Sequence, residues 1–97
     1  MKKFITFEGG EGSGKSTQSI LLSKSLEKIN ENFFLTREPG GTEISEKIRN
    51  LLVRETERDF LPETELLLVY AARHEHVKKK IIPNLIFFIL IILLEVI

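Results

Sequence analysis

The chain has 97 residues, a length that accommodates one small domain. Basic and acidic side chains balance at 14 each, so the formal net charge is zero and no nucleic-acid surface is indicated. The chain contains no cysteine, which excludes disulfides and thiolate metal sites and fits a reducing compartment. The apolar segment before Glu8 is too short for the core of a signal peptide, so a cytoplasmic location is expected.

The first expected elements are a strand over residues 3–8 and a helix over residues 15–29, separated by a glycine-rich loop. Apolar side chains at near-helical spacing indicate the helix, namely Ile20, Leu22, Leu26 and Ile29. Residues 9–17 read GGEGSGKST, a complete G-x-x-x-x-G-K-[ST] pattern. Glycines in such a loop let backbone N–H groups point at phosphate oxygens, and the following helix adds its positive end. Lys15 can reach the β- and γ-phosphates and the Ser16 hydroxyl can ligate Mg²⁺, so the pattern predicts a nucleotide-phosphate site.

A second strand is expected over residues 33–35, followed by a loop over residues 37–41. Strand, loop, helix and strand form one βαβ unit, so the sheet is expected to be parallel. Thr42 is placed to cap a second helix, with Glu43 in its first turn. One face of this helix is marked by Ile44, Ile48, Leu51 and Leu52.

Residues 54–61 are mostly polar and are expected to form a loop. A third helix should start near Pro62, and Pro83 should end or kink it. The tail from Leu85 is apolar apart from Glu95. Its β-branched and aromatic content favours a strand, whereas its length favours a helix, so both interpretations stay open.

Four segments, in order along the chain, resemble bacterial thymidylate (dTMP) kinases. They are residues 7–18 around the glycine loop, residues 36–42 (TREPGGT), residues 46–49 (EKIR), and residues 71–73 (AAR) followed by residues 82–85 (IPNL). The resemblance implies an α/β fold of the P-loop NTPase type, a parallel sheet with flanking helices in three layers, incomplete in this chain. It also implies ATP and Mg²⁺ as cofactors, dTMP as the second substrate, and a homodimer.

The resemblance also assigns site residues. The ATP phosphates would be bound by the loop residues Gly9, Gly10, Glu11, Gly12, Ser13, Gly14, Lys15, Ser16 and Thr17, with Ser16 on the metal. The dTMP would be bound by Glu11, Arg37, Pro39, Arg49 and Arg73, with Arg73 on the thymine ring. Lys15 and Arg37 would be the catalytic residues in transfer of the ATP γ-phosphoryl group to the dTMP phosphate.

Spacing alone leaves plainer interpretations open for several of these side chains. Arg49 follows Glu46 by three residues on a helix and could form a solvated ion pair. Arg73 could be an ordinary exposed charge. His74 and His76 do not face each other on a helix, so no metal site is expected there.

The resemblance ends after Leu85. The family pattern calls for a third strand ending in Asp-Arg, whereas residues 86–97 contain neither residue. We therefore divide the chain into a kinase-like part, residues 1–85, and an apolar tail that does not match the family, and hypothesise that the reading frame is truncated or shifted there. Val69 is a second departure, because the family usually places there an aromatic residue that stacks on thymine. Without the family's later strands, the first strand is expected to lack a partner on one side.

Three functions compete. The first is ATP-dependent phosphorylation of dTMP, with activity expected to be lost because the Asp-Arg motif and the lid segment are missing. The second is nucleotide binding without catalysis. The third is membrane anchoring through the tail behind residues 78–80, which is disfavoured because the apolar run is about half the roughly 20 residues that a spanning helix needs.

Overall fold

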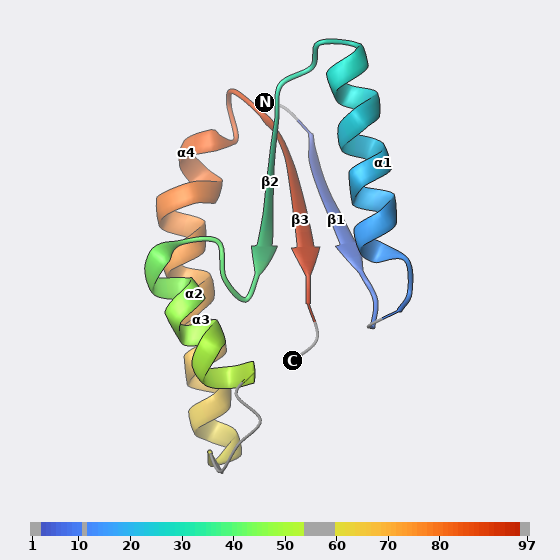
Figure 1. Cartoon of the computed structure of the whole chain (residues 1–97). Coiled ribbons are helices and arrows are strands. Elements are labelled where there is room, and N and C mark those ends of the chain that lie inside the picture. The colour runs from blue at the N-terminus through green and yellow to red at the C-terminus, as the bar shows by residue number, and fades with distance from the viewer. Residues whose placement is uncertain (1–2, 11, 54–59, 96–97) are drawn as a thin grey trace.

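A three-stranded parallel sheet organises the chain in a computed structural model that describes residues 3–10, 12–53 and 60–95. Its strands are β1 (Phe4–Glu8), β2 (Phe33–Glu38) and β3 (Ile89–Leu94). They lie in the order β1-β3-β2, so the last strand of the chain occupies the centre (Figure 1).

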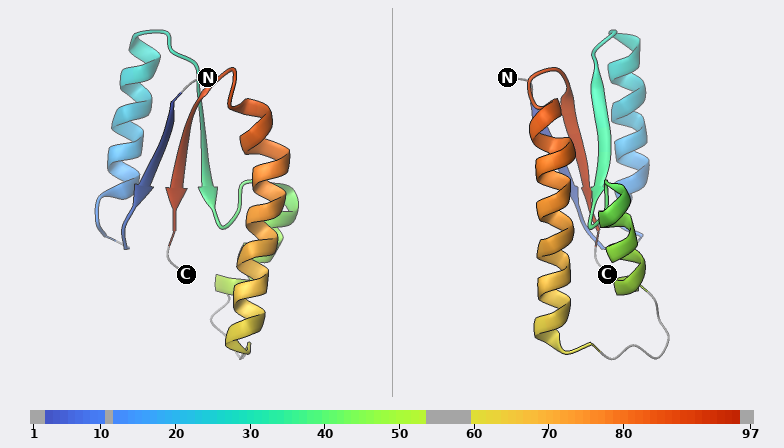
Figure 2. Two further views of the ribbon diagram at one scale, coloured as in Figure 1. Left: turned by 180° about the vertical axis from the view of Figure 1, so that it is seen from behind. Right: turned by 90° about the vertical axis from the view of Figure 1, so that its left-hand side faces the viewer.

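Helices cover both faces of this sheet, which gives three layers (Figure 2). One face carries α1 (Lys15–Lys28), and the other carries a long helical segment. That segment starts as α3 (Pro62–His76), continues through a π-helical turn (Val77–Ile81) and ends as α4 (Ile82–Asn84). The remaining helix, α2 (Glu43–Val53), packs beside α3. The expected α/β class with a parallel sheet and flanking helices is confirmed.

The core lies on the two faces of β3, because successive side chains of a strand point to opposite faces. Ile89 and Ile91 pack with Leu26 of α1. Leu90 and Ile92 pack on the opposite face with Ile81. A strand buried on both faces carries an uninterrupted apolar run, which explains the composition of the tail.

Several local predictions are confirmed. β1, α1 and the start of α3 at Pro62 lie where the sequence places them, and the helical segment ends one residue past Pro83. The hydroxyl of Thr42 accepts a hydrogen bond from the backbone N–H of Ser45 at 3.0 Å, so Thr42 caps α2 as expected. Strand and helix were both open for the tail, and its residues 89–94 form a strand.

Two predictions need correction. The second strand extends beyond Leu35 to Glu38, because Arg37 and Glu38 pair with β3 instead of opening the loop. Ile44 was expected on the buried face of α2 but is exposed. The buried residue of α2 is Ser45, whose hydroxyl donates to the backbone oxygen of Ala72 at 2.7 Å and ties α2 to α3.

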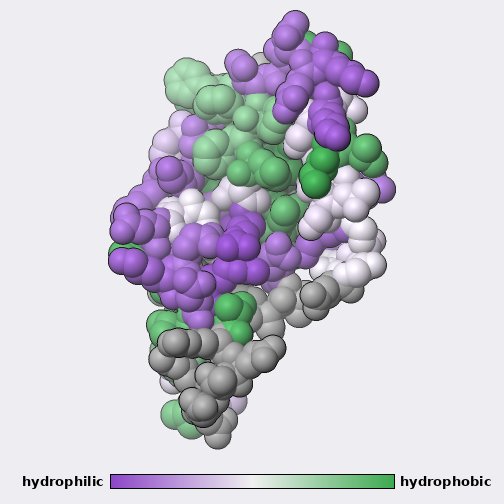
Figure 3. Space-filling view, viewed as in Figure 1, coloured by the Kyte–Doolittle hydropathy of each residue, from purple (hydrophilic) through white to green (hydrophobic). Residues whose placement is uncertain are grey.

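Some expectations concern the unpaired parts of the molecule. Within the described residues β1 pairs with β3 alone, so its other edge is unpaired as expected, and Phe4 on it is 51% exposed. Figure 3 shows apolar surface at the upper left and centre of the face seen in Figure 1. Most of the predicted loop over residues 54–61 lies outside the described residues. None of the described helices has the length and apolar character needed to cross a membrane.

We expect Leu90→Ala to lower the free energy of unfolding by about 2–5 kcal/mol, because it opens a cavity beside the fully buried centre of the sheet. Urea unfolding measures the change. Phe87→Ala is the matched control, since Phe87 is 64% exposed and its loss should cost little. Similar losses for the two variants would contradict a core built on β3.

Candidate functional site

The glycine-rich loop curls between the end of β1 and the first turn of α1. Gly12 and Gly14 have φ values of 80° and 89°, in the left-handed region that glycine adopts without strain. The N–H of Ser13 donates to the oxygen of Gly10 at 3.2 Å, which closes the turn. A cavity of about 560 Å³ opens in front of the loop and is lined by Gly10, Gly12, Ser13, Gly14, Lys15, Ser16, Thr17, Arg49 and Glu95.

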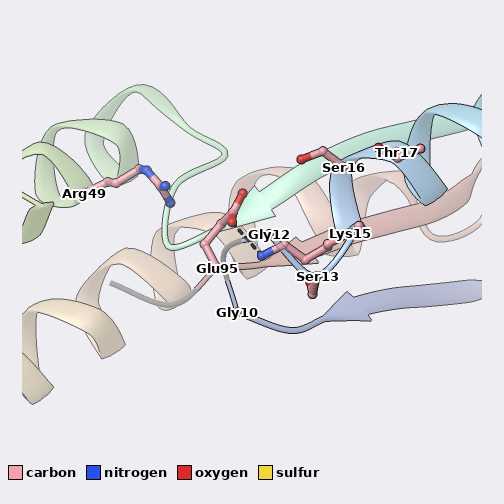
Figure 4. A pocket seen from close by; sticks show the side chains of 9 residues that line it. Gly10, Gly12, Ser13, Lys15, Ser16, Thr17, Arg49 and Glu95 are labelled. Carbon is pink, nitrogen blue, oxygen red and sulfur yellow. Dashed lines mark hydrogen bonds and ion pairs between the residues drawn. The ribbon is translucent and has the colours of Figure 1, made fainter.

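Lys15 is the first residue of α1, and its ammonium group lies among three oxygen atoms. It donates to the backbone oxygens of Gly9 and Leu94 at 3.2 and 3.1 Å and to the carboxylate of Glu95 at 2.7 Å (Figure 4). The Lys15 side chain is only 7% exposed. Because an ammonium has three donors, each is already matched, and an incoming phosphate has to share or replace one of them.

Glu95 is a site residue that the sequence prediction missed. It directly follows β3, and its N–H donates to the oxygen of Glu38 at 2.8 Å, which fixes it beside the end of β2. The available signal was that Glu95 is the single charge after residue 80. An acidic group at the carboxyl end of a central parallel strand stands where open α/β sheets bind their ligands.

Two smaller cavities adjoin the loop cavity. One, of about 120 Å³, is lined by Glu38, Pro39, Val69, Arg73, Leu94 and Glu95. The other, of about 200 Å³, is lined by Pro39, Leu52, Glu65, Val69 and Glu95. Glu95 lines all three cavities, so the phosphate loop and the pocket beside Arg73 meet at this residue.

Glu38, the last residue of β2, binds the Arg73 side chain. The Arg73 Nε donates to the Glu38 carboxylate at 2.8 Å, and Nδ1 of the fully buried His76 lies 2.8 Å from the other carboxylate oxygen. Burial raises the pKa of Glu38, but hydrogen bonds from His76 and Arg73, with the Arg73 charge, outweigh it and leave the pKa below its ordinary value. The carboxylate is therefore ionised at neutral pH.

Arg37 and Arg49 lie in different surroundings from each other. Arg37 makes a two-pronged ion pair with Glu46, which lowers the pKa of Glu46 and raises that of Arg37. Arg37 lines neither the loop cavity nor the two adjoining it. Arg49 donates instead to the oxygen of Pro39 at 2.9 Å and reaches from α2 towards the loop cavity (Figure 4), so Glu46 takes Arg37 as its partner and the plainer ion pair with Arg49 does not form.

The remaining predicted site residues divide by position. The loop residues from Gly10 to Thr17 line one cavity, apart from Glu11, which lies outside the described residues, whereas Gly9 does not line it. Val69 lines both smaller cavities, whereas Tyr70 lines neither and is exposed. Within residues 3–10, 12–53 and 60–95 no group of three or more metal-ligating side chains is present.

A family model described as thymidylate kinase matches residues 7–93, a range that includes the loop, Arg73 and most of β3. The chain belongs to the thymidylate kinase family. The matched range ends inside β3, but a range of similarity does not define a domain boundary, so the division after residue 85 stays a prediction.

Individual thymidylate kinases match the chain over most of its length. The chain is 58% identical over 83 residues to that of Rickettsia canadensis and 55% identical to that of Vesicomyosocius okutanii, over 86% of this chain in both. It spans about two fifths of these curated relatives, 39% and 40%. The crystal structure of the thymidylate kinase from Ehrlichia chaffeensis matches with a TM-score of 0.82 at 46% identity, covering 96% of this chain and 53% of that one.

We expect stability to depend on the charge of Glu38. Its pKa is lower in the folded than in the unfolded chain, so its contribution is full above the unfolded value of about 4.3 and disappears as the pH falls through the folded value. Glu38→Gln should therefore destabilise the chain more at pH 7 than at pH 3 in urea unfolding. Glu43→Gln is the control, because the Glu43 side chain is 86% exposed and its ion pair with Lys47 contributes little. If Glu38→Gln lowers the free energy of unfolding by the same amount at pH 7 and pH 3, an ionised Glu38 carboxylate is contradicted.

Proposed function

We propose that this chain carries the ATP-phosphate site and part of the dTMP site of a thymidylate kinase, which transfers the γ-phosphoryl group of ATP to dTMP. The observation that carries the proposal is that Glu95 lines both the phosphate-loop cavity and the pocket beside Arg73. A phosphoryl transfer between two nucleotides needs their phosphates in adjoining sites, because catalysis consists mainly of positioning and charge neutralisation.

The loop supports the ATP side of the proposal. Its left-handed glycines and the amino end of α1 present backbone N–H groups and a positive dipole, which suit a polyphosphate. Lys15 would bind the phosphates once one of its present acceptors is exchanged. Ser16, which lines the cavity, and Glu95 supply the oxygen ligands that Mg²⁺ prefers, and the ion would neutralise phosphate charge.

Pro39, Arg73 and Arg49 support the dTMP side. Pro39 and Arg73 line the smaller pocket, and Arg49 faces the loop cavity beside it. We propose that Arg73 hydrogen-bonds the pyrimidine and that Arg49 contacts the phosphate. For Arg37, the proposed catalytic role requires release from Glu46 or an indirect action through it. A cytoplasmic location and pairing of two copies are part of the same proposal, supported by the resemblance alone.

We further propose that these 97 residues bind nucleotides with little turnover. Residues 86–97 contain no arginine, and one arginine that stabilises the transferred phosphoryl group contributes about 10³- to 10⁵-fold in rate. Nucleotide binding without catalysis is therefore the second candidate function for this length of chain. The full reaction belongs to the proposal for a whole kinase.

We expect Mg-ATP and dTMP each to raise the thermal unfolding midpoint of the chain, since a ligand at about 100 times its Kd stabilises by roughly 2.7 kcal/mol. Lys15→Ala should remove the shift caused by Mg-ATP and keep that caused by dTMP, and Arg73→Ala should do the reverse. Lys24→Ala and His74→Ala are matched controls on exposed positions of the same helices. Absence of any shift in the unmodified chain would contradict the proposed binding function.

We expect dTMP-dependent formation of ADP by the purified chain to stay at background. The measurement is a coupled ADP assay with and without dTMP, with Lys15→Ala as the blank for contaminating kinases. Turnover at the median enzyme rate of about 10 s⁻¹ that Lys15→Ala abolishes would show that the 97 residues are a complete catalyst.

A further inference from the structure

A polar cluster of Thr36, Glu38, Arg73 and His76 adjoins the small pocket, and Glu38 and His76 within it are buried. Glu38 receives Arg73 Nε and His76 Nδ1, each at 2.8 Å, on its two different carboxylate oxygens. His76 Nε2 lies 2.7 Å from the hydroxyl oxygen of Thr36. The cluster thus joins the end of β2 to the last turns of α3, and three of its members were not predicted as site residues.

Hydrogen-bond chemistry fixes the direction of each contact. An ionised carboxylate can only accept, so His76 must carry a proton on Nδ1 whatever its charge. When the ring is neutral, Nε2 is an acceptor and the Thr36 hydroxyl donates to it. Both Glu38 oxygens are occupied, so neither His76 nor Arg73 can lose its contact without leaving a buried partner unsatisfied.

Gly41, the second glycine after Pro39, leaves room for the imidazole. A Cβ on Gly41 would collide with Cδ2 and Nε2 of His76 and would also press on the Thr36 hydroxyl. Gly41 has a φ of 94°, which other residues rarely adopt. The TREPGG segment therefore both supplies the carboxylate and accommodates the histidine that orients it.

Arg73 lines the pocket, and the two Nη groups of its guanidinium are not bonded to Glu38. Its side chain is 52% exposed and lines the 120 Å³ cavity, and among the described residues its two Nη groups have no hydrogen-bond partner. A guanidinium is a rigid plane, so fixing Nε limits the directions in which Nη donors can point. An arginine fixed in this way loses less rotamer freedom on binding a ligand.

We propose that Glu38 and His76 are positioning residues that hold the Arg73 guanidinium for a carbonyl acceptor of the pyrimidine base. The identity of this ligand rests on the proposed function. Affinity for the base then depends on Glu38 and His76, because these two residues fix the orientation of Arg73. The pair should therefore affect base recognition and leave phosphate binding unchanged.

Two variants of His76 separate positioning from simple packing. In His76→Asn the amide nitrogen replaces Nδ1 and can still donate to Glu38, whereas in His76→Gln it replaces Nε2 and reaches towards Thr36. Both remove the buried ring. Glu38→Ala removes both carboxylate oxygens, so Arg73 Nε and His76 Nδ1 lose their common acceptor and the cluster breaks.

The first measurement is calorimetric binding of dTMP, deoxyribose 5-phosphate and Mg-ATP to each chain. Glu38→Ala and His76→Gln should raise the Kd for dTMP about tenfold or more, the loss expected for one charge-assisted hydrogen bond. The Kd values for deoxyribose 5-phosphate and Mg-ATP should stay unchanged, and His76→Asn should keep most of the dTMP affinity. Equal losses for all three ligands, or unchanged dTMP binding in Glu38→Ala, would overturn the inference.

The second measurement needs no ligand and separates this inference from the proposed function. The Arg73 Nε–H resonance in a ¹H–¹⁵N spectrum should be shifted and slow to exchange in the free chain and in His76→Asn. It should move to the position of exposed arginines in Glu38→Ala and His76→Gln. A chain that binds dTMP with a freely exchanging Arg73 Nε–H overturns the positioning role alone. If the Arg73 Nε–H exchanges slowly but the chain does not bind dTMP, the proposed ligand is wrong, and the cluster then only holds Arg73 in place.

Discussion

The pairing of β3 with strands on both of its sides is the constraint on which the structure depends. β1 and β2 do not pair with each other, and residues 89–94 supply the backbone partners for both. The same six residues present apolar side chains to both helical layers, which joins the two halves of the core. A tail that failed to insert would leave two separate strands with unpaired edges and α1 without most of its packing surface.

The insertion of β3 also assembles the site. The end of the strand brings the oxygen of Leu94 and the carboxylate of Glu95 to Lys15, which lies some eighty positions earlier in the chain. The Glu95 N–H, bonded to Glu38, keeps that carboxylate between the phosphate loop and the Arg73 pocket. Stability and site geometry are therefore linked, because one strand supports both. Since Glu95 forms an ion pair with Lys15 in the free chain, the proposed phosphate binding would involve an exchange of acidic partners around one ammonium group.

Local signals predicted much of the fold. The glycine loop, α1, the Thr42 cap and the start of α3 follow from short patterns whose physical causes lie within a few residues. The tail could not be assigned, because an apolar run fits either a buried strand or a helix until its partners are known. The contacts of Glu38 with His76 and of Lys15 with Glu95 join distant segments, so no spacing rule reveals them. For Arg37, the resemblance predicts a type of role. It does not reveal that Glu46 binds Arg37 in the free chain.

Amide hydrogen exchange of the free chain, resolved by NMR, tests the placement of β3 most directly. The N–H groups of Leu90 and Ile91 should exchange only through global unfolding, with a protection free energy equal to the unfolding free energy from urea. Exchange of these amides at rates near those of an unstructured chain, while α1 stays protected, would show that the tail is not the centre of the sheet. In that case β3 would not connect the two parts of the core, and it would not place Glu95 in the wall that the cavities share.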